Sequence, residues 1–396
     1  MQEKQATIYL DNASTTSLDS KVLEAMLPYF KEQFGNASSI HALGQTARVA
    51  VEKAREQVAL FLNCKESEVY FTPSATFSDN LAILGVVRVA QKKGIKPHII
   101  TNVIEHPAVL EPIKHLEKTG QIEATFLPVY QEGIVKVEDV ERAIKSNTCL
   151  VSIMQANNEI GTIQPIDEIA QVIGNFRGPK KYPLFHTDAV QAANYLDLNV
   201  EKLGVDLLTL SGHKIYGPKG IGVLYVKQST LLEPIVFGGH QEAGLIPGTE
   251  NVANIVGLGK AIELVKSSKL KVQSLRKLRD KLIDGILKEI PQTFLNGSRE
   301  QRLANNANIS FKGVEGEALL ILLDQAGIAV STGSACSSGS LEASHVLMAL
   351  DCGKERAHSA VRFSLSKNTI EKEIDYVLNV LPKMVEHLRK ISGFKV

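Results

Sequence analysis

The chain has 396 residues, in which 44 Lys and Arg balance 43 Asp and Glu to a formal net charge of +1. With 44% hydrophobic and 22% charged residues, the composition is that of an average soluble globular protein, which excludes a disordered chain and a collagen-like repeat. The near-zero charge argues against a nucleic-acid partner, because such proteins carry clustered basic residues. No apolar run approaches the roughly 18 residues of a membrane span, and the first residues carry no apolar signal segment. We therefore expect a cytoplasmic protein without a membrane partner.

Short apolar runs alternate with longer amphipathic stretches through the first two-thirds of the chain. Strands are predicted at residues 68–72, 98–103, 149–154, 184–187, 207–210 and 221–226, and helices at about 78–90 and 107–118. The run 149–154 is almost continuously apolar, which is typical of a strand buried on both faces of a parallel sheet. This alternation predicts an α/β domain with a mainly parallel sheet.

The pattern changes from about residue 252. A helical pattern rich in Lys, Arg and Leu runs to about residue 289. Two further strands, near 308–311 and 361–364, alternate with helices up to a last one at about 370–389. This part of the chain predicts a smaller α+β domain. We assign residues 15–258 to the large domain, and residues 1–14 and 259–396 to the small one.

Polar residues follow several predicted strands, where α/β proteins place ligand-binding groups. Ser74, Ala75 and Thr76 open a helix whose first N–H groups suit a phosphate, although an ordinary N-cap is the better explanation when they are taken alone. His106 follows the next strand, as either a functional group or a cap. Residues 155–161, which include Asn158, place two adjacent amides and a Glu at one strand end. An ordinary turn requires no such group, so this segment indicates a binding site.

Two ionisable residues stand at the ends of other buried strands. Asp188 needs a cation opposite it, which is either a pyridinium nitrogen or a Lys or Arg. Lys214 follows an apolar strand and precedes a Gly/Pro turn, where a lysine held against the core can act as an amine nucleophile. Lys219 is the competing lysine, but its position inside the turn predicts that it faces solvent.

The chain contains four cysteines, and no two of them lie at a metal-site spacing. We expect neither a disulfide framework nor a metal site built by the protein alone. Cys64, Cys149 and Cys352 fit the usual role of small buried hydrophobic residues. Cys336 differs, because the small, flexible residues of segment 331–340 surround it. Such a context favours a mobile nucleophile.

Together these features resemble the cysteine desulfurases, which are pyridoxal 5'-phosphate (PLP) enzymes of fold type I in the class V aminotransferase superfamily. The resemblance runs nearly end to end, through residues 9–16, 34–41, 211–220, 331–340 and 359–365. The form of the cysteine loop is similar to that of the housekeeping and nitrogen-fixation branch. The resemblance implies the α/β architecture of fold type I, with a large domain and a smaller α+β domain. It also implies that L-cysteine gives L-alanine and a persulfide on Cys336, whose sulfur passes to an acceptor protein for iron–sulfur cluster assembly or thiolation.

The resemblance further implies a role for each candidate residue. Lys214 would carry PLP and move the α-proton, Asp188 would keep the pyridinium nitrogen protonated, and His106 would stack on the ring and transfer protons. Cys336, as a thiolate, would attack the sulfur of the bound cysteine, and it could ligate a transient iron–sulfur cluster together with a partner. The remaining residues would bind the cofactor phosphate (Ala75, Thr76, Ser211 and His213), the ring oxygen or the substrate (Asn158 and Gln191), the substrate carboxylate (Arg362), and the phosphate of the partner subunit in a homodimer (Thr249).

Some positions depart from the family pattern. Ser74 and Phe77 stand where the family usually has Gly and Glu, while His240 replaces a common glycine, and Ala243 and Ile246 stand where arginines are common. Two alternatives therefore remain open. One is another reaction on the same scaffold, such as selenocysteine or cysteine-sulfinate lyase activity, which needs no thiol nucleophile. The other is a weakly active sulfur-assembly scaffold.

Overall fold

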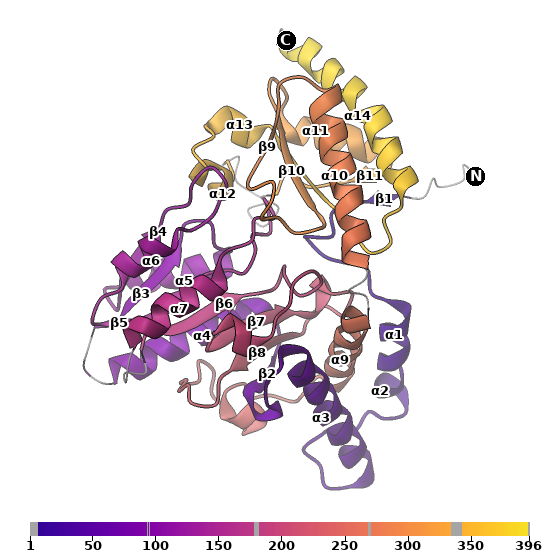
Figure 1. Ribbon diagram of the computed structural model, residues 1–396. Coiled ribbons are helices and arrows are strands. Elements are labelled where there is room, and N and C mark those ends of the chain that lie inside the picture. The colour runs from indigo at the N-terminus through magenta and orange to yellow at the C-terminus, as the bar shows by residue number, and fades with distance from the viewer. Residues whose placement is uncertain are drawn as a thin grey trace.

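The computed structural model describes residues 7–92, 94, 96–177, 182–267, 271–333 and 343–394. They form a large α/β region around a seven-stranded sheet and a smaller region around a three-stranded sheet (Figure 1). The smaller region contains the C-terminal helix α14 and also receives the first strand of the chain, β1. The predicted fold class is confirmed. The predicted domain boundaries stay a prediction.

The large sheet has the strand order β2-β8-β7-β6-β5-β3-β4. Strand β8 runs antiparallel to both of its neighbours, and the remaining pairs are parallel. The carboxyl ends of β5, β6 and β7 therefore lie at one edge, where polar groups from separate loops can meet. The strands are β2 (Val69–Thr72), β3 (His98–Asn102), β4 (Glu123–Leu127), β5 (Thr148–Ser152), β6 (Leu184–Asp188), β7 (Leu207–Ser211) and β8 (Gly222–Val226).

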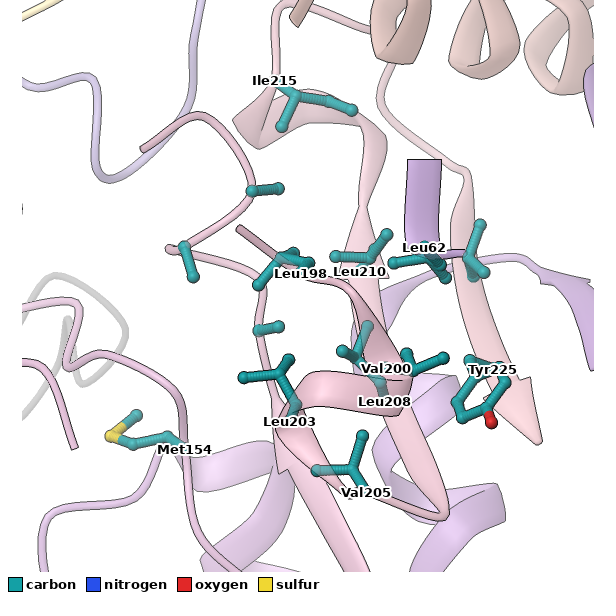
Figure 2. Packing of buried hydrophobic residues seen from close by; sticks show 14 of the residues in the cluster. Leu62, Met154, Leu198, Val200, Leu203, Val205, Leu208, Leu210, Ile215 and Tyr225 are labelled. Atoms are coloured by element: carbon teal, nitrogen blue, oxygen red, sulfur yellow. The ribbon is translucent and has the colours of Figure 1, made fainter. Parts of the chain in front are cut away.

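Each face of this sheet is buried by a different set of helices. Successive side chains of a strand point to opposite faces, so Leu207 packs with α4 and α5 whereas Leu208 packs into the larger cluster on the other face. Figure 2 shows part of this larger cluster, which includes Val200 and Leu203 of α8 and Leu208 and Leu210 of β7. The helices of this region are α1 (Ser20–Met26), α2 (Pro28–Lys31), α3 (Ala42–Leu62), α4 (Ala75–Gln91), α5 (Pro107–Lys118), α6 (Val137–Ala143), α7 (Ile166–Arg177), α8 (Val200–Leu203) and α9 (Val252–Ser267).

The smaller region has its own hydrophobic core. Its sheet has the order β12-β10-β9 and is antiparallel, and α10 and α14 pack on each other beside it. Strand β1 joins this region by pairing in parallel with β11. The elements are β1 (Ile8–Tyr9), α10 (Lys271–Glu289), β9 (Thr293–Leu295), β10 (Asn306–Phe311), α11 (Gly316–Gln325), β11 (Ile328–Ala329), α12 (His345–Ala349), α13 (Lys354–His358), β12 (Ala360–Ser364) and α14 (Glu371–Ser392).

The predicted strands agree with the structure, which also contains strands and a helix break that the sequence pattern did not indicate. The helical pattern of residues 252–289 contains two helices, because α9 packs on α3 in the large region whereas α10 packs on α14 in the small one. Strand β4 was not predicted, since it is only partly buried and carries a weak alternation. Among the described residues, none of the helices combines the length and the apolar character that crossing a bilayer requires.

Candidate active site

A cavity of about 520 Å³ opens where β6 and β7 end and α4 begins. Its walls come from segments that are far apart in the sequence, including residues 13–15, the loops after the parallel strands, and β12 of the small sheet. The predicted site residues that line this cavity are Ala75, Thr76, His106, Asn158, Asp188, Gln191, Ser211, His213, Lys214 and Arg362. Within the described ranges, no group of three or more His, Cys, Asp or Glu side chains could hold a metal ion.

The start of α4 forms one end of the cavity. Ser74 caps this helix, because its Oγ accepts a hydrogen bond of 3.1 Å from the N–H of Phe77. The first turn of this 17-residue helix contains no acidic residue, so its N–H groups and its dipole suit an anion. Gly222 of β8 permits the close approach, because a Cβ at this position would lie 2.8 Å from the carbonyl carbon of Ser74. This end of the cavity is suited to a phosphate.

Ser211 and His213 come from the segment that follows β7, beside the start of α4. The Nδ1 atom of His213 lies 3.1 Å from the Oγ1 of Thr15. Burial, with smaller contributions from two lysines, lowers the pKa of His213 to about 4. The imidazole is therefore neutral at pH 7 and contributes a hydrogen bond to the site, not a charge.

The amine of Lys214 points toward the N-terminal segment of the chain. Its Nζ donates hydrogen bonds of 2.6 and 2.7 Å to the carbonyl oxygens of Ala13 and Ser14. Gln191 donates to the same oxygen of Ala13 over 3.0 Å. Lys214 belongs to a short 3-10 turn, Gly212–Lys214, which ends the strand β7. The amine is thus held at the cavity wall by backbone oxygens that lie about 200 positions away in the sequence. Lys219 touches the same cavity but is exposed, as the sequence predicted.

Asp188 ends strand β6 with its carboxylate buried. Its Oδ1 accepts a hydrogen bond of 2.9 Å from the N–H of Val190. Burial raises the pKa of Asp188 to about 6, while this hydrogen bond and the charge of Lys214 oppose the rise. The carboxylate is therefore mostly ionised at pH 7, and a cation in the cavity would stabilise it further.

His106 caps the N-terminus of α5. Its Nδ1 accepts a hydrogen bond of 3.1 Å from the N–H of Ala108. Burial, followed by the charges of Lys214 and His345, lowers the pKa of His106 to about 4. A neutral imidazole that accepts at Nδ1 carries its proton on Nε2, so this ring has one fixed tautomer and one N–H left to donate.

Arg362 brings a cation from β12 to the cavity. One of its Nη atoms donates a hydrogen bond of 2.9 Å to the carbonyl oxygen of Asn158. The other Nη atom donates hydrogen bonds of 2.8 Å to Asp11 Oδ1 and 2.7 Å to Ser14 Oγ. The buried Nε has no hydrogen-bond partner among the described residues. This N–H remains available to a ligand, and a carboxylate is its natural partner.

Two predicted residues are not brought to this cavity by the described chain. Thr249 lines a neighbouring cavity of about 210 Å³, which shares Gly220 and Ile221 with the first. Cys336 lies outside the described residues. The described chain on both sides of it lies against Glu159, because Ser344 Oγ donates to Glu159 Oε2 over 2.5 Å and a Cβ at Gly333 would lie 3.1 Å from the same oxygen.

Sequence reasoning missed some residues of the site. Asp79 lines the cavity from α4, four residues after the start of this helix, and was not singled out. The available signal was a single carboxylate on a face of this helix that is otherwise apolar. The carbonyl groups of Ala13 and Ser14 carry no signal in the sequence, because every residue has a carbonyl oxygen.

The departures from the family pattern are accommodated locally. Ser74 has a φ of −168°, which is extended backbone that any residue adopts, so the site does not require glycine here. Phe77 and Ile246 are both partly buried and pack against the hydrophobic cluster that lies between the sheet and the helices α4 and α5. Apolar packing therefore holds these two positions in place.

The segment around Ala243 is held by an ion pair. Glu242 and Ala243 have positive φ values of 46° and 54°, which are uncommon for residues with a side chain. Both carboxylate oxygens of Glu242 accept from Arg55, at 2.9 and 2.8 Å, and one also accepts from the N–H of Phe71. These partly buried contacts stabilise the unusual backbone, and Gln241 and Glu242 form part of the wall of the neighbouring cavity.

Comparison with known proteins gives consistent matches over nearly the whole chain. The profile of the family "aminotransferase class-V" matches residues 8–377. The chain is 49% identical to a cysteine desulfurase IscS of Dictyoglomus turgidum over 390 residues, which cover 98% of this chain and 97% of the relative. It is 48% identical to a cysteine desulfurase IscS of Methanosarcina thermophila, with coverages of 97% and 93%.

Solved structures agree with the sequence relatives. A NifS-like protein superposes with a TM-score of 0.89 at 37% identity and covers 96% of this chain and 100% of its own. A structure described as SspA in complex with cysteine has a TM-score of 0.79 at 36% identity, with coverages of 92% and 100%.

Proposed function

We propose that this chain, which belongs to the class-V aminotransferase family, is a PLP-dependent cysteine desulfurase whose persulfide forms on Cys336. The substrate is L-cysteine, and the products are L-alanine and a sulfur atom held on the enzyme. The convergence of Lys214, Asp188, His106 and Arg362 on one cavity is the observation that carries the proposal.

The residues of the cavity fit PLP at each of its parts. The start of α4, with Ser211 and His213 beside it, suits the phosphate. The buried carboxylate of Asp188 suits the ring nitrogen, which is cationic when protonated. When bound, PLP supplies an electron sink that stabilises negative charge on the α-carbon of an amino acid. His106 and Lys214 line the space between these two ends.

Three side chains are proposed to hold or move protons. Asp188 keeps a proton on the ring nitrogen of the cofactor by remaining ionised beside it. Lys214 holds the cofactor through its Nζ and later takes the proton from the α-carbon of the substrate. His106 is neutral at pH 7, since burial lowers its pKa to about 4, and its Nε2 is suited to proton exchange with the substrate.

Arg362 and Asn158 are proposed to bind the substrate. The Nε of Arg362, which has no partner among the described residues, donates to the substrate carboxylate, while the Nη groups are fixed by Asn158, Asp11 and Ser14. A guanidinium whose two Nη atoms are already held by hydrogen bonds is oriented before the substrate arrives, which lowers the entropic cost of binding. Gln191 and the side chain of Asn158 lie at the cavity wall, in reach of the ring oxygen or the substrate.

Cys336 is proposed as the nucleophile. Its thiolate attacks the sulfur of L-cysteine, a new S–S bond forms, and the C–S bond breaks with its electron pair passing to carbon. That β-carbon then takes up a proton, and the α-carbon regains the proton held by Lys214, which gives L-alanine and leaves the sulfur as a persulfide on Cys336. Cys336 follows Gly333 by three residues, which an extended chain spans in at most about 11 Å. Because Gly333 lines the cavity, this short tether supports the assignment.

The assembly and the destination of the sulfur are also proposals. Thr249 lines a separate cavity of its own chain, so we expect it to reach the phosphate site of a partner subunit in a homodimer. The persulfide would pass to an acceptor protein for iron–sulfur cluster assembly or thiolation, and Cys336 could ligate a transient cluster with that partner. The cytoplasmic location expected from the sequence belongs to the same proposal.

The decisive experiment measures alanine and sulfide released from L-cysteine in the presence of dithiothreitol. The wild type is compared with Cys336→Ser and with the control variant Cys352→Ser. In the wild type, the thiol of Cys352 donates a hydrogen bond to the carbonyl oxygen of Leu347. We expect equimolar alanine and sulfide from the wild type and the control. Cys336→Ser should lose both products while it keeps the yellow colour of bound PLP.

Other outcomes would assign the protein differently. Release that survives in Cys336→Ser would move the chemistry to a direct lyase, which needs no thiol. A wild type that binds PLP but releases nothing would contradict the proposed substrate. A colourless wild type would favour a sulfur-assembly scaffold. A comparison of Lys214→Ala with Lys219→Ala then tests which lysine holds the cofactor. Only Lys214→Ala should lose bound PLP.

A further inference from the structure

Asp79 is a buried carboxyl group that the mechanism above does not use. It lies on α4, four residues after the start of this helix, is 1% exposed and lines the same cavity as Asp188. Its Oδ1 has no hydrogen-bond partner among the described residues and lies 3.6 Å from Nε2 of His186. An ionised carboxylate in such surroundings costs several kcal/mol unless a cation or several donors compensate it, so its protonation state needs an explanation.

A continuous chain of hydrogen bonds links Asp79 to Ser152 through the side chains of Thr209 and His186. The Thr209 side chain bonds to the Asp79 carboxyl group, and its Oγ1 lies 3.1 Å from Nε2 of His186. On the other side of the ring, Nδ1 of His186 lies 2.9 Å from the Oγ of Ser152. Thr209, His186 and Ser152 are all fully buried. The chain therefore joins α4 to β7, β6 and β5 without contact with solvent.

Two proton arrangements satisfy every bond in this chain. Burial lowers the pKa of His186 to about 3, so its ring is neutral and carries one N–H. If Asp79 is protonated, it donates to Thr209, Thr209 donates to His186, and His186 donates to Ser152. If Asp79 is ionised, each of the three bonds runs in the opposite direction. The choice between the two is set by the charges around Asp79.

These charges favour the protonated arrangement. Asp79 is faced by Asp188 on β6 and by Glu105 after β3, and both carboxyl groups are buried. Carboxyl groups that share one apolar site cannot all be ionised. Burial, followed by the charge of Asp188, raises the pKa of Asp79 well above its ordinary value, and the smaller effect of the Thr209 hydrogen bond opposes this rise. Asp188 has the better means to remain ionised, because it receives the N–H of Val190 and is close to the charge of Lys214.

We propose that Asp79 is a positioning residue that retains a proton through the chain Thr209–His186–Ser152, so that Asp188 remains the only ionised carboxylate of the pair. The proposal rests on the proposed function, in which the ionised Asp188 faces the ring nitrogen of PLP. The neutral carboxyl group of Asp79 then donates a hydrogen bond to Thr209. Because Asp79 carries no negative charge, it does not drive Asp188 to take up a proton. The chain acts on the cofactor through Asp188 alone.

Infrared difference spectroscopy on the full-length protein tests the protonation states directly, with and without bound PLP. At pH 7, subtracting the Asp79→Asn spectrum from the wild type should show a protonated carboxyl band that shifts in D₂O. Subtracting the Asp188→Asn spectrum should show a carboxylate band, which becomes protonated below about pH 6 in the PLP-free protein. In Asp79→Asn, the titration midpoint of Asp188 should move by less than about half a unit, because the variant replaces one neutral group by another.

A carboxylate band lost in Asp79→Asn would overturn the proposal, as would a fall of about one unit or more in the midpoint of Asp188, since either shows that Asp79 was charged. Thr209→Val serves as a second variant if Asp79→Asn does not fold. It removes the acceptor of the proton, so it should shift the protonated band and leave the Asp188 band in place. An unshifted protonated band in Thr209→Val would also overturn the proposal.

Cofactor binding supplies a further readout. The dissociation constant of PLP at pH 7 should change less than about threefold in Asp79→Asn and should rise about tenfold or more in Asp188→Asn, which loses an ionised partner. A loss in Asp79→Asn as large as that in Asp188→Asn would contradict a role through Asp188. These readouts do not depend on turnover. If the proposed function is wrong, the wild type will release no alanine from L-cysteine. If this inference is wrong, the infrared carboxyl bands of Asp79 and Asp188 will differ from those expected.

Discussion

At the scale of the residue, the site consists of side chains whose donors are mostly occupied before a ligand arrives. Arg362 illustrates this arrangement, since its two Nη groups bond to Asn158, Asp11 and Ser14, and only Nε is left without a partner among the described residues. The ion pair with Asp11 is itself nearly buried on the arginine side, so solvent does not compete for the guanidinium. Because the Nη groups are held in place, the direction of the Nε–H is fixed, so the guanidinium selects a carboxylate by geometry as well as by charge.

Arg362→Lys should therefore weaken the use of L-cysteine without removing PLP. Lysine places one point charge where arginine reaches Asn158, Asp11 and the substrate at once. Loss of a charge-assisted hydrogen bond of about 1.5–3 kcal/mol corresponds to a fall of roughly 10- to 100-fold in kcat/KM, mainly through KM. Steady-state alanine release and the PLP absorbance measure the two effects.

Arg356→Lys is the matched control for this prediction. Arg356 also bonds to backbone and amide oxygens, but it contacts Asn296 and Leu295 outside the cavity. Its replacement should leave kcat/KM within about twofold of the wild type, because it touches neither substrate nor cofactor. Equal losses in the two variants would show that Arg362 has only a structural role.

At the scale of the element, the parallel strands tie their buried polar side chains together across the sheet. His98 begins β3 and is fully buried, with Nδ1 2.8 Å from Thr148 Oγ1 on β5 and Nε2 2.9 Å from Thr125 Oγ1 on β4. Burial, with the charge of Lys145, lowers the pKa of His98 to about 4. The ring is a neutral cross-link between three strands at the end of the sheet away from the cavity.

This cross-link predicts a pH dependence of stability. The folded-state pKa of about 4 lies below the ordinary value of 6.5, so the contribution of His98 is fully present above pH 6.5 and is lost as the pH falls toward 4. The unfolding free energy of the wild type relative to His98→Gln should therefore decrease between pH 6.5 and 4. Urea unfolding at several pH values measures it, and a difference that grows on acidification would contradict the argument.

At the scale of the whole molecule, a buried arginine joins the two regions near the substrate-binding segment. Arg302 is 1% exposed and donates 2.7 Å to the carbonyl oxygen of Ser298 and 2.6 Å to that of Ile160. It also bonds to Asn306 of β10 and to the carbonyl oxygen of Asn296. Burial lowers its pKa to about 9, so it remains a cation at pH 7. The small sheet thus fixes the loop that carries Asn158 and Glu159.

Arg302→Met should destabilise the protein and weaken substrate binding together. The variant keeps most of the apolar stem but leaves several buried carbonyl groups without a donor, which lowers the unfolding free energy by roughly 3 kcal/mol or more. Arg299→Met is the control, because its ion pair with Asp284 is exposed and contributes at most about 1 kcal/mol. The midpoints of urea unfolding and the KM for L-cysteine distinguish the two variants. Equal midpoints would contradict the role of Arg302 as a link.

Much of the fold and the reactive residues could be predicted from the sequence, because their signals are local. The apolar runs fixed the strands around the cavity, and the polar residues that follow them indicated His106, Asp188 and Lys214. The context of small residues singled out Cys336 in the same way, and this assignment stays a prediction. Strand formation and helix caps depend on neighbours in the chain, which a pattern can display.

Only the tertiary structure decided which distant groups act together. The amine of Lys214 meets carbonyl oxygens of Ala13 and Ser14, and Arg362 meets Asp11, across sequence separations that no local pattern records. The Asp79 Oδ1, which has no hydrogen-bond partner in the described part of the chain, likewise owes its position to the packing of α4 against β6 and β7. The sequence by itself determined the chemistry available to this protein, whereas burial and long-range contact decided the charge and orientation of each group.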